Sequence, residues 1–247
     1  MKYFKSSLSF AFVLTFLAPF TGNAQSLFDN FSGTSVNSNL WAITLPYSDS
    51  SVTEGGGVVS IENNGRLTTQ VAMPSSYSVS GEFLMANNPY SNFKVVLRAD
   101  GTLDSTEAEG IAFQFQIETD GGDTSENLRI FSIGNPAGDF TTPEVTANLT
   151  LNSWNTFLIT DNGYNLNLYF DGASTPTVSA NSTFGVGNLV TFYNREGAAA
   201  GSSISANGVT ELNYINIQTV PEPCSFAMIG LGALTLARLR MMNGQRK

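Results

Sequence analysis

Three acidic residues lie close together in the middle of the chain, and their types and spacing could support catalysis. Glu118 and Asp120 are two positions apart, so on a β-strand both carboxyl groups would lie on the same face. Two carboxyl groups about 5 Å apart can cleave a glycosidic bond, one as nucleophile and the other as acid. The stretch from Asp120 through two glycines to Asp123 has the composition of a turn, which would move Asp123 off that face. A solvated acidic hairpin is therefore the favoured interpretation, and a catalytic pair is the alternative.

The same acidic stretch could bind calcium. Asp120, Asp123 and nearby backbone carbonyls offer the hard oxygen ligands that calcium prefers, although their spacing is not that of an EF-hand loop. The chain contains no His, which removes the usual general base and the commonest transition-metal ligand. We therefore predict no cofactor other than this candidate calcium ion, and no catalysis that depends on an imidazole.

Polar side chains on two predicted strands could form one sheet face that binds sugar hydroxyl groups. Amides both donate and accept hydrogen bonds, and an aromatic ring can stack on a pyranose. The wet side of any antiparallel sheet has the same composition, so that simpler interpretation stays open. Trp41 and Trp154 have apolar neighbours and are expected in the core rather than in a binding site. The sugar-binding candidates are Gln114, Gln116, Asn165, Asn167 and Tyr169.

These candidates need strands to position them, and period-two alternation predicts such strands between Leu27 and Thr219. At 111–118, for example, Phe113 and Phe115 fall on one face and Gln114 falls on the other. No helical period of useful length occurs in this part of the chain. The sequence therefore predicts an all-β fold, a two-sheet antiparallel sandwich in one domain. The other predicted strands are 58–61, 66–71, 77–85, 92–98, 128–133, 154–160, 164–170, 189–193 and 210–218.

Several segments carry the pattern of a known family, namely 29–33 (DNFSG), 39–41 (NLW), 64–67 (NGRL), 153–172 and 214–217. They resemble the concanavalin A-like jelly roll of lectins and laminarinase-type glycoside hydrolases. The resemblance implies a jelly-roll sandwich. It also implies a strand with two Glu and one Asp at alternate positions facing a sugar cleft, and Glu118 and Asp120 match that spacing. The last acidic residue is Asp123, where the family has Glu.

The N-terminus has the pattern of a secretory signal peptide. Lys2 and Lys5 precede an apolar stretch at 8–20, and small residues at 22–24 end it. Signal peptidase is therefore expected to cleave after Ala24, and the protein is expected to be exported. The division of the chain that follows is 1–24 for the signal peptide, 25–219 for the β-sandwich domain and 220–247 for a C-terminal signal.

The C-terminal signal has three parts in order: a Pro-Glu-Pro motif, an apolar run at 226–237 and a basic tail. It resembles the PEP-CTERM sorting signal of Gram-negative bacteria, which implies exosortase as a processing partner. The apolar run would form a short transmembrane helix that anchors the protein transiently in the inner membrane, before it reaches the cell surface or is secreted. Cys224 stands where the family has Ser or Thr. The motif is Val220, Pro221, Glu222 and Pro223, and the tail contains Arg238, Arg240, Arg246 and Lys247.

The charge distribution argues against nucleic acid as a partner. All twenty acidic residues lie between Asp29 and Glu222, where only five of the eleven basic residues occur, and an acidic surface repels phosphate. The main expectation is an exported, exosortase-processed surface or matrix protein, not an enzyme, whose sandwich binds extracellular polysaccharide in a biofilm. The alternatives are a glycoside-active enzyme that uses Glu118 and Asp120, and a structural subunit that self-associates through a sheet edge.

Overall fold

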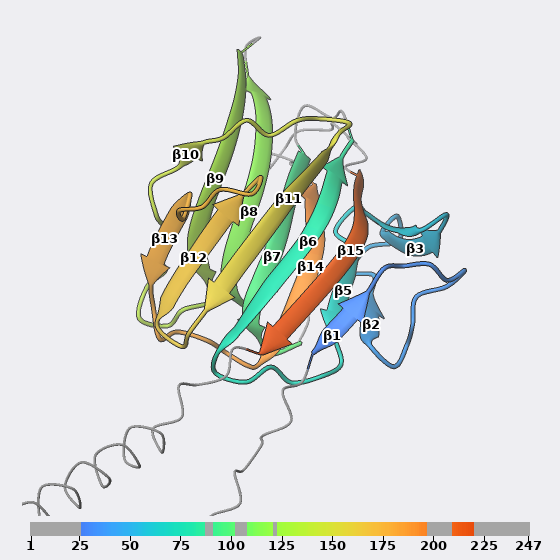
Figure 1. Ribbon diagram of the computed structural model, residues 1–247, viewed down its shortest axis with the longest axis horizontal. Helices are drawn as coiled ribbons and strands as arrows, with labels where there is room; N and C mark the ends of the chain where they lie inside the picture. The colour runs from blue at the N-terminus through green and yellow to red at the C-terminus, as the bar shows by residue number, and fades with distance from the viewer. Residues whose placement is uncertain (1–25, 87–90, 102–107, 121–122, 197–208, 220–247) are drawn as a thin grey trace, which may run out of the picture.

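The structure, a computed structural model, consists of two antiparallel β-sheets packed face to face (Figure 1). It describes residues 26–86, 91–101, 108–120, 123–196 and 209–219. The predicted all-β sandwich is therefore confirmed.

Sheet A has eight strands, in the order β13 (Val178–Asn181), β12 (Asn165–Phe170), β11 (Trp154–Asp161), β6 (Tyr77–Met85), β15 (Val209–Thr219), β4 (Val58–Glu62) and β3 (Ser51–Gly55), with β1 (Leu27–Asp29) paired to β15. Sheet B has seven, in the order β10 (Val145–Thr146), β9 (Asp123–Ile133), β8 (Gly110–Asp120), β7 (Ser91–Ala99), β14 (Leu189–Glu196), β5 (Arg66–Thr69) and β2 (Trp41–Thr44).

The core lies between the two sheets and is rich in phenylalanine. The Phe83 ring of sheet A lies 4.8 Å from the Phe115 ring and 5.0 Å from the Phe93 ring of sheet B, measured between centroids. Phe157 of sheet A lies 5.7 Å from Phe115, and all four rings are buried. Aromatic pairs at such separations stabilise a core beyond the area that they bury. Because successive strand residues point to opposite faces, this core sends the neighbours of Phe93 and Phe115 to the outer face of sheet B.

Every strand predicted from alternation is present. Alternation does not predict β1, β2, β3, β10 or β13, which are two to five residues long. Four of these strands, β2, β3, β10 and β13, form the edges of the two sheets. Short edge strands show little alternation, because they contribute few side chains to the core.

A hairpin joins β8 to β9. β8 continues to Asp120 and β9 begins at Asp123, so only residues 121–122 separate the two strands. Asp120 pairs directly with Asp123, and Glu118 pairs with Ser125. The predicted turn after Asp120 is therefore present and places Asp123 on β9 rather than on β8.

The predicted signal peptide and the predicted PEP-CTERM signal fall in residues 1–25 and 220–247, which lie outside the described residues. Among the residues that the structure describes, no helix is long and apolar enough to cross a membrane. Both transport signals therefore stay predictions from the sequence.

Candidate functional site

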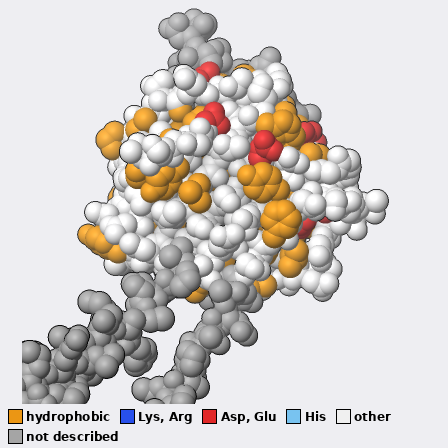
Figure 2. Space-filling view, viewed as in Figure 1, with side chains coloured by type: hydrophobic (Ala, Val, Ile, Leu, Met, Phe, Trp, Pro, Cys, Tyr) orange, Lys and Arg blue, Asp and Glu red, His pale blue; other side chains and the backbone are white. Residues whose placement is uncertain are grey.

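The outer face of sheet B carries most of the basic residues of the sandwich. The strands of sheet A contain no Lys or Arg, whereas those of sheet B contain Arg66, Lys94, Arg98, Arg129 and Arg195. All of these except Arg98 alternate with core residues and so belong to the outer face. Figure 2 shows the opposite side of the molecule, where sheet A is in front, with hydrophobic and acidic side chains but no basic ones.

Five outward residues of sheet B form a row that crosses the sheet perpendicular to its strands. Pairing places Arg66 of β5 opposite Tyr193 of β14, then Lys94 of β7, Gln114 of β8 and Arg129 of β9, each opposite the one before it. Adjacent strands are about 4.8 Å apart, so this row is about 19 Å long. We call it the basic row.

The three cations of the basic row lie over aromatic rings. The Arg66 guanidinium is 5.6 Å from the centre of the Tyr193 ring, and the Lys94 ammonium is 5.5 Å from the same centre. Lys94 is also 5.1 Å from the ring of Phe131 on β9, and the Arg129 guanidinium is 5.0 Å from that ring. Such cation–π contacts are favourable, and more so where water is excluded. Cations and rings therefore alternate across the sheet.

A second row of outward residues lies beside the basic row and consists mainly of amides. Pairing places Arg195 of β14 opposite Asn92, Asn92 opposite Gln116, and Gln116 opposite Asn127 of β9. Gln116 also accepts a hydrogen bond from Gln114 of the basic row. We call this set the amide row. Two of the five predicted sugar-binding residues, Gln114 and Gln116, thus lie together at the middle of the outer face.

The candidate carboxylates lie on β8 and β9 beyond the amide row. Glu118 follows Gln116 by two residues, which is about 7 Å along a strand, and Asp120 follows by two more. The side chains of Glu118, Asp120 and Asp123 lie outside the described residues, so the structure gives their backbone register only. Among the described outward positions of β8, from Gly110 to Gln116, no residue carries a carboxyl group. Any carboxyl pair on this strand must therefore lie at its hairpin end.

The centre of the outer face is buried, and its β9 edge is open. Lys94 is fully buried and Gln114 is 1% exposed, whereas the side chain of Arg129 is 31% exposed. Beyond β9 the chain returns alongside that strand, and the amide of Ser132 donates a hydrogen bond to the carbonyl of Phe140 at 3.0 Å. A cavity of 240 Å³ lies at this edge, lined by Arg129, Phe131, Ser132, Ile133, Asp139, Phe140 and Thr141.

Arg129 connects the basic row to this cavity. Its Nη1 donates a hydrogen bond to Oε1 of Glu144 at 3.1 Å, and its Nη2 donates to Oε1 of Gln114 at 3.2 Å. The Nε atom is buried and has no hydrogen-bond partner. Two protein groups therefore position the guanidinium, and the Arg129 side chain lines the cavity.

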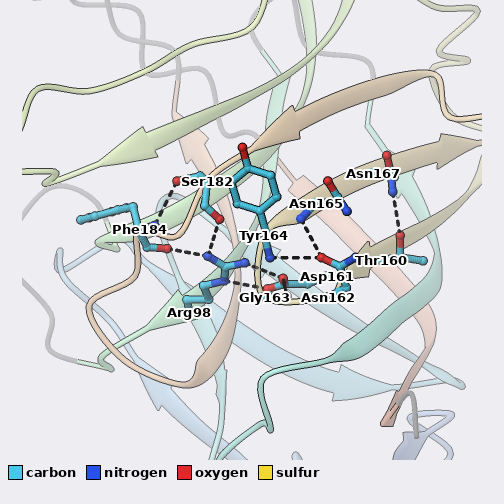
Figure 3. Close-up of polar contacts among 10 residues, drawn as sticks. All are labelled: Arg98, Thr160, Asp161, Asn162, Gly163, Tyr164, Asn165, Asn167, Ser182 and Phe184. Atoms are coloured by element: carbon cyan, nitrogen blue, oxygen red, sulfur yellow. Dashed lines mark hydrogen bonds and ion pairs between the residues drawn. The ribbon is translucent and has the colours of Figure 1, made fainter. Parts of the chain in front are cut away.

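The other three predicted sugar-binding residues lie on the opposite side of the molecule. Asn165, Asn167 and Tyr169 alternate with core residues along β12 of sheet A. The amide of Asn167 accepts a hydrogen bond from Ser179 at 2.8 Å. It also donates one to Thr160 at 3.4 Å (Figure 3). The prediction that all five residues form one face is therefore wrong. β8 and β12 belong to different sheets, and each strand directs its polar side chains away from the shared core.

The two tryptophans differ from each other. Trp41 is 1% exposed and its indole nitrogen donates a hydrogen bond to Asp29 at 2.7 Å, so its predicted place in the core is confirmed. Trp154 is 40% exposed, and its predicted place in the core is wrong. On β11, Phe157 and Ile159 point into the core, and alternation sends Trp154 to the outer face of sheet A.

Arg98, at the end of β7, ties the two sheets together. Its Nε and Nη2 donate to the two carboxylate oxygens of Asp161 at 2.8 and 2.5 Å, and its Nη1 donates to the carbonyls of Ser182 and Phe184 at 2.9 and 2.8 Å (Figure 3). Burial raises the pKa of the neighbouring Tyr77 phenol, and the Asp161 carboxylate raises it further. A cavity of 330 Å³ lies beside this cluster. Because every nitrogen of the guanidinium is engaged, we assign Arg98 a structural role.

No metal site is visible in the described part of the chain. Within it, no three His, Cys, Asp or Glu side chains are grouped so that they could hold a metal ion. The calcium candidates, Asp120 and Asp123, have side chains outside the described residues. Calcium binding therefore stays a prediction.

The basic row was not predicted, although part of its signal is present in the sequence. Lys94 alternates with Phe93 and Val95, and Arg129 follows the core residue Leu128, so both positions could be read as outward. Alternation does not show which strands are neighbours. The assembly of these cations into one row therefore appears only in the folded structure.

No protein-family model matches this chain, and no curated protein matches it. Solved structures do match. The β-glucanase of Bacillus licheniformis matches with a TM-score of 0.57 and 14% identity, over 79% of this chain and 98% of the glucanase. A glycosyl hydrolase family 16 protein from Mycobacterium smegmatis matches with a TM-score of 0.55 and 10% identity, over 77% of this chain and 98% of that one. A Mycobacterium tuberculosis protein described as a pseudo beta-1,3-glucanase matches with a TM-score of 0.55 and 10% identity, over 78% and 98%.

At identities this low the matches establish the fold, which is the concanavalin A-like jelly roll found in glycoside hydrolase family 16. They also correct the main expectation from the sequence. The structures that match along almost their whole length include a β-glucanase and a glycosyl hydrolase, beside the pseudo beta-1,3-glucanase. The prediction of a non-catalytic matrix protein that is no enzyme is therefore contradicted, and the glycoside-active alternative is the better supported one.

Proposed function

We propose that the protein is glycoside-active: it binds a polysaccharide chain along the amide row and the open β9 edge of the outer face of sheet B, and it cleaves the chain with Glu118 and Asp120. The observation that carries this proposal is the match of the whole sandwich to a β-glucanase, 98% of which is covered. The amide row supports it further. Asn92, Gln116 and Asn127 come from three adjacent strands, and their amides can donate to and accept from sugar hydroxyl groups.

The carboxyl groups are assigned from the register of β8 and β9. Glu118 and Asp120 occupy alternate positions that continue the series of Gln114 and Gln116, so the same outer face receives them. Asp123 is paired with Asp120 across the hairpin, so its backbone lies beside the proposed pair. In glycoside hydrolysis with retention, one carboxyl group acts as nucleophile and the other as acid and then base, and we propose these roles for Glu118 and Asp120.

Hydrolysis of a β-glucan such as laminarin tests this proposal. We expect the wild-type chain to release reducing ends and both Glu118→Gln and Asp120→Asn to abolish the release. Glu211→Gln makes the same chemical change on β15 of sheet A, and its rate should equal that of the wild type. Binding of glucan without any release of reducing ends would refute the cleavage step. This outcome has to be tested, because one structure with this fold is described as a pseudo beta-1,3-glucanase.

We also propose that this activity is exercised outside the cytoplasm. The support is in the sequence alone: an N-terminal stretch with the pattern of a signal peptide, and a C-terminal stretch that resembles a PEP-CTERM signal. Signal peptidase and exosortase would be the processing partners. Mass spectrometry of both mature ends from the native host tests it, and an intact chain recovered from the cytosol would refute it.

A further inference from the structure

Four of the five basic residues in the strands of the sandwich lie on one surface. The strands of sheet A contain no Lys or Arg, while the outer face of sheet B contains Arg66, Lys94, Arg129 and Arg195. The sandwich domain, 25–219, also holds nineteen of the twenty acidic residues of the chain. A polyanion is therefore repelled by the body in general and attracted where the cations gather.

Two of these four cations are buried, which is rare for Lys and Arg. Arg66 and Lys94 have no exposed surface. The removal of a cation from water is unfavourable, and the contacts with Tyr193 and Phe131 offset part of that loss. The solubility of the sandwich domain does not require Arg66 and Lys94, because this domain has a large excess of acidic residues. Charges retained in such an environment are concentrated at functional sites.

The other two cations are accessible to a ligand. Arg195 is exposed, and 31% of the Arg129 side chain is exposed beside the 240 Å³ cavity. Two carboxylates lie near Arg129. Asp139 lines the cavity and accepts hydrogen bonds from Ser132 Oγ and from the amide of Asn135, both at 3.1 Å, and Glu144 forms an ion pair with Arg129 at 3.1 Å with 47% of its side chain exposed. A guanidinium fork suits the oxygens of an anionic group better than an ammonium group does.

We propose that the polysaccharide bound on the outer face of sheet B is anionic. Its carboxylate or sulfate groups contact Arg129 at the cavity and Arg195 at the end of the amide row, and the buried Arg66 and Lys94 add to the positive potential between them. The inference rests on the proposed function, because it names the class of glycan that the same face binds.

The experiment compares one glycan backbone with and without charge. Affinities of the full chain are measured for laminarin, for carboxymethylated laminarin and for sulfated laminarin, with alginate as a natural carboxylated chain. We expect a charged glycan to bind at least about tenfold more tightly than laminarin, and its affinity to fall as salt rises. The carboxylated and sulfated arms show which anionic group is preferred.

Matched variants locate the contact. Arg129→Gln and Arg195→Gln should each weaken binding of the charged glycan by roughly tenfold, and Arg129→Lys should keep the salt dependence while losing part of the affinity. Asn167→Asp changes the net charge by the same amount on the outer face of sheet A and should leave the affinity unchanged. Unaltered thermal melting confirms that each variant is folded.

The outcomes separate the two proposals. Equal or tighter binding of neutral laminarin, or equal weakening by Asn167→Asp and Arg129→Gln, overturns the anionic assignment and leaves the proposed function in place. Failure to bind any of these glycans overturns both.

Discussion

Replacement of Arg98 is expected to weaken the sandwich strongly, because it breaks a buried ion pair between the two sheets. Its guanidinium makes two hydrogen bonds to Asp161, whose side chain has no exposed surface, and two more to the carbonyls of Ser182 and Phe184. The removal of one partner from a buried ion pair leaves the other charge uncompensated, which costs about 3–5 kcal/mol. We expect Arg98→Met to lower the free energy of unfolding by this amount, a large part of the stability of an ordinary domain.

Equilibrium unfolding in urea, followed by tryptophan fluorescence, measures this loss. Adding Asp161→Asn to Arg98→Met should restore part of it, because the double change leaves no buried charge behind, and the double-mutant cycle gives the coupling energy. Arg195→Gln, at an exposed position, is the control and should change the stability by less than about 0.5 kcal/mol. A loss below about 1 kcal/mol for Arg98→Met would refute the reasoning, since surface ion pairs contribute that much.

Two further changes test the packing and the predicted metal. Gly81→Ala should destabilise the fold by about 1–3 kcal/mol. A Cβ at this position on β6 would lie 2.7 Å from Cδ1 of Ile215 and 2.8 Å from the carbonyl oxygen of Tyr214, both on β15. An unchanged melting temperature would show that β6 and β15 can move apart without cost. If Asp120 and Asp123 hold calcium, as the sequence predicts, added calcium should raise the melting temperature and EDTA should lower it, and a melting temperature unmoved by both would remove the site.

The fold class could be predicted because each long strand has one buried face. β6 is the clearest case, since buried and half-buried residues alternate along all of Tyr77–Met85. The hydrophobic face of such a strand must be buried against another layer, which here is a second sheet. The same logic fails for β10 and β13, which are two and four residues long and lie at sheet edges.

The site could be predicted only in part, because alternation within a strand does not show which strands are neighbours in the sheet. Gln114 and Asn167 look alike in the sequence, each a polar residue between apolar ones, yet they lie on opposite faces of the molecule. Their separation follows from long-range pairing, which joins β8 to β7 and β9 but joins β12 to β11 and β13. Lys94 shows the same limit. Alternation predicts that its side chain points outward, but it does not predict that the side chain is buried on the outer face of the folded sheet.

Hydrogen–deuterium exchange of the backbone amides, with and without bound polysaccharide, tests most directly where the protein binds its glycan. We predict slower exchange on β8 (Gly110–Asp120) and β9 (Asp123–Ile133) when the glycan is bound, and no change on β12 (Asn165–Phe170). Slower exchange confined to β12 would contradict the assignment of the binding face to sheet B.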